Sequence, residues 1–103
     1  MGYETHIESV PGSEDKDIML FTLSTCVWCK KTKTLLQDLG LAYSFVDVDT
    51  LSGAEQDAAY QDMWKYNQST SFPTIVVNDG RQVILGFDEG ELRGLAQEIT
   101  ENE

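Results

Sequence analysis

The two cysteines are the residues whose type and spacing point most directly to chemistry. Cys26 and Cys29 are separated by Val27 and Trp28, and the chain of 103 residues has no other cysteine. Two cysteines are too few for the disulfide framework that stabilises small secreted domains. A C-x-x-C pair is typical of a thiol-disulfide exchange site, and it also supplies half of a four-ligand zinc site.

The position of the pair favours redox chemistry. The apolar run Ile18 to Leu23 predicts a buried strand, and a helical pattern begins at Val27, so the cysteines fall where a strand passes into a helix. Free amides and the positive end of the helix dipole stabilise an anion there, which favours a thiolate at Cys26. Lys30 adds a positive charge that supports this thiolate. We therefore predict that the Cys26 thiolate attacks a disulfide and that Cys29, one turn further on, resolves the product.

Two other interpretations of the pair stay open from the residues alone. A structural zinc site needs four ligands, and the single histidine, His6, stands far away in the sequence, so metal binding would need a second copy of the chain. A purely structural disulfide is the other alternative. The strand and helix on either side of the pair favour thiol-disulfide exchange over both.

A second candidate element is the proline step Phe72-Pro73. It precedes a predicted strand, and an X-Pro bond is the one peptide bond that adopts the cis form at small cost. A cis bond would turn backbone groups of Phe72 toward an extended peptide. A trans proline that merely ends a loop is the alternative.

Apolar patterns predict the elements that position these residues. We expect strands at 18–23, 43–48, 74–77 and 82–85, the last two joined by the turn Asn78-Asp79-Gly80. We expect helices at 27–39, from a capping box at Ser52 and Glu55 to about Tyr66, and after Asp88, which with Glu91 can cap the last helix. The order is β-α-β-α-β-β-α. Residues 18–103 form one domain in this interpretation, and residues 1–17 form a mobile arm that can supply one edge strand.

Composition limits the partners and the compartment. The chain carries 18 acidic and 7 basic residues, a net charge of −11, which disfavours nucleic acid and anionic membranes as partners. No run approaches the length of a membrane span, and the N-terminus lacks the pattern of a signal peptide. We expect a cytoplasmic monomer. Three of the basic residues, Lys30, Lys31 and Lys33, gather beside the cysteines, where they either steer an acidic partner or form a solvated helix face.

Together these features resemble the thioredoxin superfamily and, within it, the glutaredoxins and the NrdH-type glutaredoxin-like redoxins. The resemblance spans roughly residues 17–100. It is carried by the first strand, Cys26-Val27-Trp28-Cys29 with Lys31-Thr32-Lys33 after it, Phe72-Pro73-Thr74, and Gly86-Phe87-Asp88. It implies an α/β, thioredoxin-like three-layer fold with a central mixed four-stranded sheet and an N-terminal extension.

The resemblance also implies roles. Cys26 becomes the nucleophile, Cys29 the resolving cysteine, and Pro73 a cis-proline that faces them. A groove for the substrate would be bordered by Val27, Trp28, Phe72, Pro73, Thr74, Gly86, Phe87 and Asp88. The redox-active disulfide needs no further cofactor, and the partners would be a disulfide-containing protein, with ribonucleotide reductase among the candidates, and an electron donor.

Departures from the family patterns bear on the donor. The thioredoxin pattern is absent, because Thr25 precedes Cys26 and no Gly-Pro separates the cysteines. Glutaredoxins often have a lysine shortly before the first cysteine and two adjacent glycines late in the chain, and both are missing here. We therefore expect an NrdH-like carrier reduced by a thioredoxin-reductase-like or ferredoxin-linked donor, with a glutathione-dependent glutaredoxin as the alternative and a metal or iron-sulfur scaffold as the third.

Some residues receive weaker assignments. Trp28 either borders the site as an exposed recognition platform or packs in the core among leucines. Asp47 and Asp49 follow a predicted strand, and we interpret them as loop or helix-entry residues rather than as a metal or acid-base site. His6 receives no role.

Overall fold

A computed structural model describes residues 2–14, 16–69 and 71–101, with side chains described as far as residue 96. The strands are β1 (Glu8–Val10), β2 (Ile18–Thr22), β3 (Tyr43–Asp47), β4 (Thr74–Val77) and β5 (Gln82–Leu85). The helices are α1 (Val27–Asp38), α2 (Gly53–Trp64) and α3 (Glu89–Glu101), with short 3₁₀ turns at Glu4–His6, Val48–Thr50 and Asn78–Gly80. The predicted order of the elements after residue 17 is confirmed.

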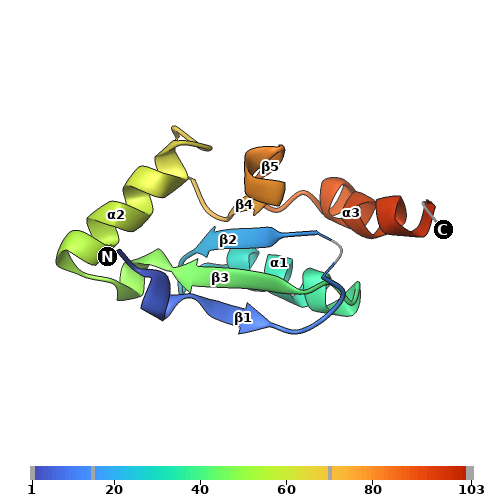
Figure 1. Cartoon of the computed structure of the whole chain (residues 1–103), viewed down its shortest axis with the longest axis horizontal. Helices are drawn as coiled ribbons and strands as arrows, with labels where there is room; N and C mark the ends of the chain where they lie inside the picture. Colours follow the sequence, from blue (N-terminus) through green and yellow to red (C-terminus); the bar gives the residue numbers. More distant parts are fainter. Residues whose placement is uncertain (1, 15, 70, 102–103) are drawn as a thin grey trace.

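The strands form one mixed sheet in the order β1-β3-β2-β4-β5 (Figure 1). Strands β2 and β3 are parallel, as the strand-helix-strand unit through α1 requires, and the other neighbouring pairs are antiparallel. The sheet therefore has five strands, because β1 adds the edge strand that the N-terminal segment was expected to be able to supply.

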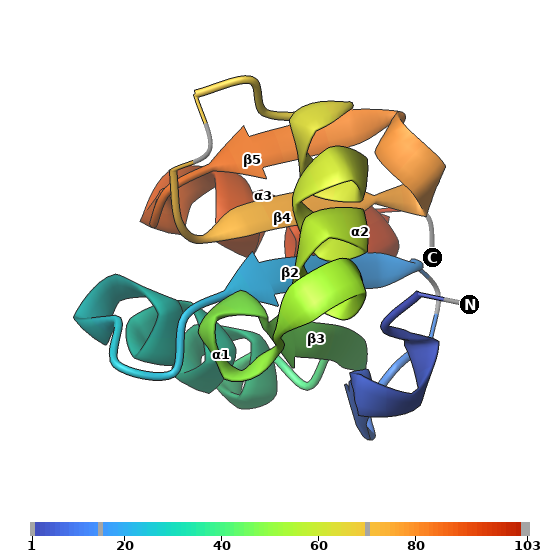
Figure 2. The same cartoon turned by 90° about the vertical axis from the view of Figure 1, so that its left-hand side faces the viewer.

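Helices cover both faces of the sheet, which gives the three layers of a thioredoxin-like fold (Figure 2). Helices α1 and α3 lie on one face over a core that includes Leu20 and Ile75, while α2 lies on the other over a core that includes Phe21 and Val76. Neighbouring residues of one strand thus enter opposite cores, because side chains alternate across a strand. This double burial explains the continuous apolar run of β2.

The N-terminal segment packs against the domain, which corrects its interpretation as a mobile arm. Its strongest anchor is Tyr3, which the sequence analysis did not single out. The Tyr3 side chain is buried, its hydroxyl donates to Asp62 Oδ2 at 2.7 Å, and its ring meets Phe21 edge-on at 6.3 Å. His6 Nε2 in the same segment lies 3.2 Å from Glu55 Oε1.

The two predicted helix caps have different outcomes. Asp88 caps α3 as expected, because its Oδ1 accepts the amide of Glu91 at 3.1 Å. Ser52 stands at the N-cap position of α2, but its side chain makes no capping hydrogen bond, so the predicted capping box is wrong. Glu55, the other half of that box, instead faces His6 of the N-terminal segment.

In the part of the chain that the structure describes, no helix combines the length and the apolar character needed to cross a bilayer.

Candidate active site

Three loops meet at one end of the sheet and form the candidate site. Phe21 near the end of β2 pairs with Thr74 at the start of β4, and Thr74 pairs with Leu85 at the end of β5. The loop that carries the cysteines, the loop before β4 and the loop after β5 therefore leave the sheet side by side, as Figure 2 shows. The topology brings together three segments that are far apart in the sequence.

Cys26 occupies the N-cap position of α1, where the sequence placed it. Its backbone is extended (φ −88°, ψ 118°), and its Sγ accepts the amide of Cys29 at 3.2 Å. A sulfur in this position satisfies one of the free amides at the start of the helix, as an anionic capping group does. Its side chain is partly exposed, so an incoming disulfide can reach it.

Cys29 lies beneath it and is fully buried. Burial, followed by the hydrogen bond with Cys26, raises the pKa of the Cys29 thiol to about 12, while the backbone of Leu23 and the ammonium of Lys33 act in the opposite direction. Both sulfurs are present as free thiols. The site therefore pairs an accessible sulfur with a protonated, inaccessible one.

An exposed aromatic surface borders the cysteines on the side of α3. Trp28 is 54% exposed and its ring stacks on Phe87 at 5.7 Å, while Lys31 Nζ lies 4.8 Å from the centre of the Trp28 ring. Val27 is 61% exposed beside it. Trp28 is therefore exposed and does not pack in the core, and its role as a recognition platform stays a prediction.

The proline loop forms another border. The peptide bond between Phe72 and Pro73 is cis, as the family resemblance implied, and the Pro73 carbonyl accepts the amide of Gly86 at 2.8 Å. Phe72 is half-buried and meets Tyr60 of α2 edge-on at 6.3 Å. Val27, Trp28, Phe72, Gly86, Phe87 and Asp88 all have at least part of their surface accessible.

Pro73 and Thr74 differ from these groove residues, because both are buried. The side chain of Thr74 is fully buried, and its Oγ1 donates to the Ser71 carbonyl at 2.8 Å and accepts from Asn67 Nδ2 at 2.8 Å. The Thr74 side chain therefore supports the proline loop from inside and cannot line a groove. Asn67, only 2% exposed, is the loop anchor that the sequence analysis missed. Its signal was an amide residue just after a predicted helix end.

The lysines beside the cysteines occupy different environments. Lys30 and Lys31 are exposed, whereas the side chain of Lys33 is 19% exposed and its Nζ lies 3.3 Å from Asp47 Oδ1. The predicted supporting charge was Lys30, and Lys33 had no separate predicted role. The spacing of four residues between Cys29 and Lys33, which places both on one side of a helix, was the signal that could have found it.

Asp49 fixes the loop that leads to Cys26. Its carboxylate accepts the Ser24 amide at 2.8 Å and the Ser24 hydroxyl at 2.6 Å, and these hydrogen bonds lower the pKa of Asp49. The interpretation of Asp47 and Asp49 as structural residues of a loop thus gains specific contacts for both.

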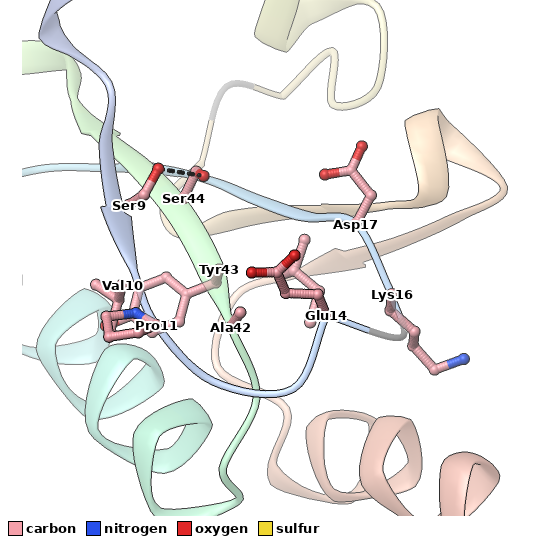
Figure 3. A pocket seen from close by; sticks show the side chains of 10 residues that line it. Ser9, Val10, Pro11, Glu14, Lys16, Asp17, Ala42, Tyr43 and Ser44 are labelled. Carbon is pink, nitrogen blue, oxygen red and sulfur yellow. Dashed lines mark hydrogen bonds between the residues drawn. The ribbon is translucent and has the colours of Figure 1, made fainter.

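One surface cavity lies near the cysteines, and another lies far from them. One of about 460 Å³ adjoins the aromatic surface and includes Val27, Lys30 and Phe87 in its lining. Another of about 530 Å³ lies at the opposite end of the sheet, between the end of β1 and the starts of β2 and β3 (Figure 3). In Figure 3 the Glu14 carboxylate reaches across this second cavity toward Tyr43, and Ser9 and Ser44 hydrogen-bond at its edge. It contains no part of the site.

Within residues 2–14, 16–69 and 71–101, no three His, Cys, Asp or Glu side chains are grouped so that they could hold a metal ion.

Comparisons with known proteins agree with this geometry. Residues 18–83 match the family model described as glutaredoxin. The glutaredoxin of Methanosarcina mazei Go1 is 43% identical, with a TM-score of 0.79 over 88% of this chain and 87% of that one. The methanoredoxin of Methanosarcina acetivorans is 46% identical, with a TM-score of 0.72 over 76% and 81% of the two chains. A glutaredoxin-like 8.6 kDa protein in a rubredoxin operon of Clostridium pasteurianum is 30% identical over 80 residues, which are 78% of this chain and 97% of that protein.

Proposed function

Because this chain belongs to the glutaredoxin family, we propose that it is a dithiol-disulfide oxidoreductase that reduces protein disulfides through Cys26 and Cys29. The observation that carries the proposal is the pairing of a reachable sulfur at the N-cap of α1 with a fully buried sulfur one turn further on. An accessible nucleophile and a protected resolving thiol are what a two-step exchange requires.

The proposed reaction has two steps. The Cys26 thiolate attacks one sulfur of the target disulfide, the target's S–S bond breaks, and the departing target sulfur takes up a proton. Cys29 then loses its proton and attacks the Cys26 sulfur, which releases the second target thiol. The target gains two electrons and two protons, and the protein is left with a Cys26-Cys29 disulfide that a donor must reduce.

The aromatic surface is the proposed seat for the target. Trp28, Val27 and Phe87 offer apolar area directly beside Cys26, and apolar and aromatic groups at the centre of an interface carry most of its binding energy. The proline loop lies on the other border of the site. A disulfide in an exposed, extended segment of a partner protein, with ribonucleotide reductase among the candidates, is the substrate class that we propose.

For the electron donor we propose an NrdH-like route through a thioredoxin-reductase-like or ferredoxin-linked reductase. Two features support this choice over glutathione. No lysine stands at positions 23–25, just before Cys26, and Phe87 occupies the place of a second glycine and stacks on Trp28. The protein would then be a cytoplasmic carrier whose redox centre is its own disulfide.

A donor panel tests this function. Reduction of insulin is followed with three donor systems: NADPH with thioredoxin reductase, reduced ferredoxin with its thioredoxin reductase, and glutathione with glutathione reductase. We expect turnover with at least one reductase system and none above background with glutathione. Cys26→Ser should abolish reduction, and Cys29→Ser should stop after the first attack, as a mixed disulfide visible by mass spectrometry.

The other outcomes identify the alternatives. Turnover with glutathione alone would assign the protein to the glutathione-dependent glutaredoxins. An inactive protein that carries stoichiometric zinc or iron when freshly purified, lost on substitution of either cysteine, would overturn the redox proposal in favour of a metal or iron-sulfur scaffold.

A further inference from the structure

The second step of the proposed reaction depends on a sulfur that is poorly placed to ionise. Cys29 is fully buried, and its thiol must lose a proton before it can attack the Cys26 sulfur. Burial disfavours the charged form of any thiol, and this holds in the mixed disulfide as well, where Cys26 no longer carries charge. A nearby fixed positive charge would therefore matter more for this step than for the first.

Lys33 is placed to provide that charge. It follows Cys29 by four residues on α1, a spacing that brings two side chains to the same side of a helix. Its side chain is only 19% exposed. Its ammonium contributes to the electrostatics at the Cys29 sulfur, in the direction that favours the thiolate. Lys30 and Lys31, by contrast, lie on the exposed part of the helix.

Contacts from the neighbouring strand hold Lys33 in place. Its Nζ lies 3.3 Å from Asp47 Oδ1 and 3.8 Å from the centre of the Phe45 ring, both on β3. The same Asp47 oxygen accepts the hydroxyl of Thr22 at 2.6 Å, and Thr22 is fully buried at the end of β2. A carboxylate and an aromatic ring that both contact the ammonium restrict the motion of the lysine side chain. The positive charge of Lys33 therefore stays at a fixed position relative to Cys29.

We propose that Lys33 is a positioning residue for the resolving step, whose ammonium, held by Asp47 and Phe45, favours the ionised form of Cys29 as it attacks Cys26. The inference rests on the proposed exchange function and concerns only its second half. In that half the Cys29 proton leaves, the Cys26-Cys29 bond forms, the bond from Cys26 to the target breaks, and the target sulfur takes up a proton.

The charged and titratable groups around the two residues come from two sides. Cys26 caps α1 and Lys33 lies within it, while Asp47 ends β3 and Asp49 follows that strand. The Lys33 ammonium acts to lower the pKa of Asp49 and that of Cys29. The Leu23 backbone also favours the Cys29 thiolate. Lys33 is thus the positive side chain of this group.

The test separates the two steps in time. Reduced protein is mixed with 5,5′-dithiobis(2-nitrobenzoate), and the nitrothiobenzoate released is followed at 412 nm from pH 6 to pH 9.5. The first release reports the attack by Cys26, and the second reports resolution by Cys29. Wild type is compared with Lys33→Gln, Lys33→Met and Lys33→Arg, and with Lys65→Gln, which removes the same charge from the exposed end of α2.

We expect Lys33→Gln and Lys33→Met to slow the second release by about threefold at neutral pH and to move its pH profile to higher pH. The ionised fraction of Cys29 falls without the ammonium, and the greater nucleophilicity of the more basic thiolate offsets part of the loss. The Lys33→Met variant retains an apolar side chain beside Phe45, so its second release can be measured if the Lys33→Gln variant folds poorly. Lys33→Arg should restore most of the rate, and Lys65→Gln should match wild type.

Three results are decisive. A second release with the wild-type rate and pH profile in Lys33→Gln or Lys33→Met overturns the inference, as does an Arg variant as slow as the neutral ones, because that would indicate packing rather than charge. A wild-type protein that releases only one equivalent contradicts the exchange function itself, which separates that failure from a failure of the role of Lys33.

Discussion

At the residue scale, two identical side chains acquire different chemistry from their positions. Cys26 caps a helix and is partly exposed, whereas Cys29, three residues later, faces the interior and is fully buried. One helical turn is enough to separate the two environments, because Cys26 stands at the N-cap of α1 whereas Cys29 lies within the helix, among its buried residues. The order of the two proposed steps follows from this difference in access.

Burial of Cys29 also predicts how the stability of the reduced protein depends on pH. The thiol ionises near pH 8.5 in an unfolded chain, but its folded pKa is about 12, so above about pH 9 the unfolded state loses a proton that the folded state keeps. The free energy of unfolding should therefore fall by up to about 1.4 kcal/mol per pH unit from this group between roughly pH 9 and pH 12.

Urea unfolding of reduced wild type and of Cys29→Ala at pH 7.5, 9.0 and 10.0 checks this expectation. Burial also raises the pKa of Tyr3 above its ordinary value, so Tyr3 contributes a loss of stability at high pH, but this contribution is shared by both proteins. Wild type should lose stability more steeply than Cys29→Ala between pH 9.0 and 10.0. Parallel losses in the two proteins would show that Cys29 ionises normally.

At the element scale, the predictions that succeeded came from patterns confined to one segment. The run Ile18 to Leu23 became β2, the turn Asn78-Asp79-Gly80 joins β4 and β5, and Asp88 caps α3. In the turn, Asn78, Asp79 and Gly80 have φ of 53°, 59° and 99°, a left-handed region that Asn, Asp and Gly tolerate best. Such features depend on local backbone geometry, and each residue type has known preferences for that geometry, so they can be predicted from the sequence of one segment.

Gly12 and Gly94 differ in how much space surrounds the position of a Cβ atom. Gly12, before β2, passes so close to the backbone of residues 40–42 that a Cβ would lie 2.6 Å from Ala42 N and from Leu41 C. Gly94 lies within α3 with no atom within 4 Å of the Cβ position. Gly12 is therefore required by a close approach of two chain segments, while Gly94 only weakens a helix.

We expect Gly94→Ala to raise the free energy of unfolding by roughly 0.5–1 kcal/mol through helix propensity. Gly12→Ala should lower it, because backbone atoms must move apart. This should weaken the contact in which the Ser13 amide donates to the Gly40 carbonyl and the Ala42 amide donates to the Ser13 carbonyl. Thermal unfolding of the two variants beside wild type is the measurement. Equal shifts of the same sign would contradict the close approach at Gly12.

At the scale of the whole molecule, the features that the sequence analysis missed are contacts between distant segments. Lys33 was grouped with Lys30 and Lys31, because a charged run on a helix is usually solvated, and only the packing of α1 on β3 separates it from them. Thr74 was placed in the groove, yet its side chain turns inward to Asn67. The cis form of the bond before Pro73 came from the family resemblance, since the residues themselves left both forms open.

The N-terminal segment is the largest such difference. Its composition is mostly polar, so the sequence did not indicate that one residue, Tyr3, fixes it to the domain.

The distribution of charge also depends on the fold. The chain has a net charge of −11, yet Lys30 and Lys31 line the cavity beside the candidate site together with Asp38 and Glu89, so this surface is less acidic than the molecule as a whole. The cluster was visible in the sequence, but its division into an exposed part and a buried part was not.

Tyr3 provides a test of whether the N-terminal segment is part of the folding unit. Its ring joins the α2-side core with Phe21, and its hydroxyl donates to Asp62, a residue 59 positions away in the chain. Tyr3→Ala should lower the free energy of unfolding by about 3 kcal/mol, as expected for removing a buried aromatic side chain. Tyr3→Phe keeps the ring and should cost about 1 kcal/mol for the lost hydrogen bond. Thr5→Ala is the control, because Thr5 is exposed in the 3₁₀ turn that follows Tyr3, and it should leave the free energy of unfolding within about 0.5 kcal/mol of wild type. Urea unfolding of the variants is the measurement. Equal urea midpoints for Tyr3→Ala and Thr5→Ala would show that the segment folds apart from the domain.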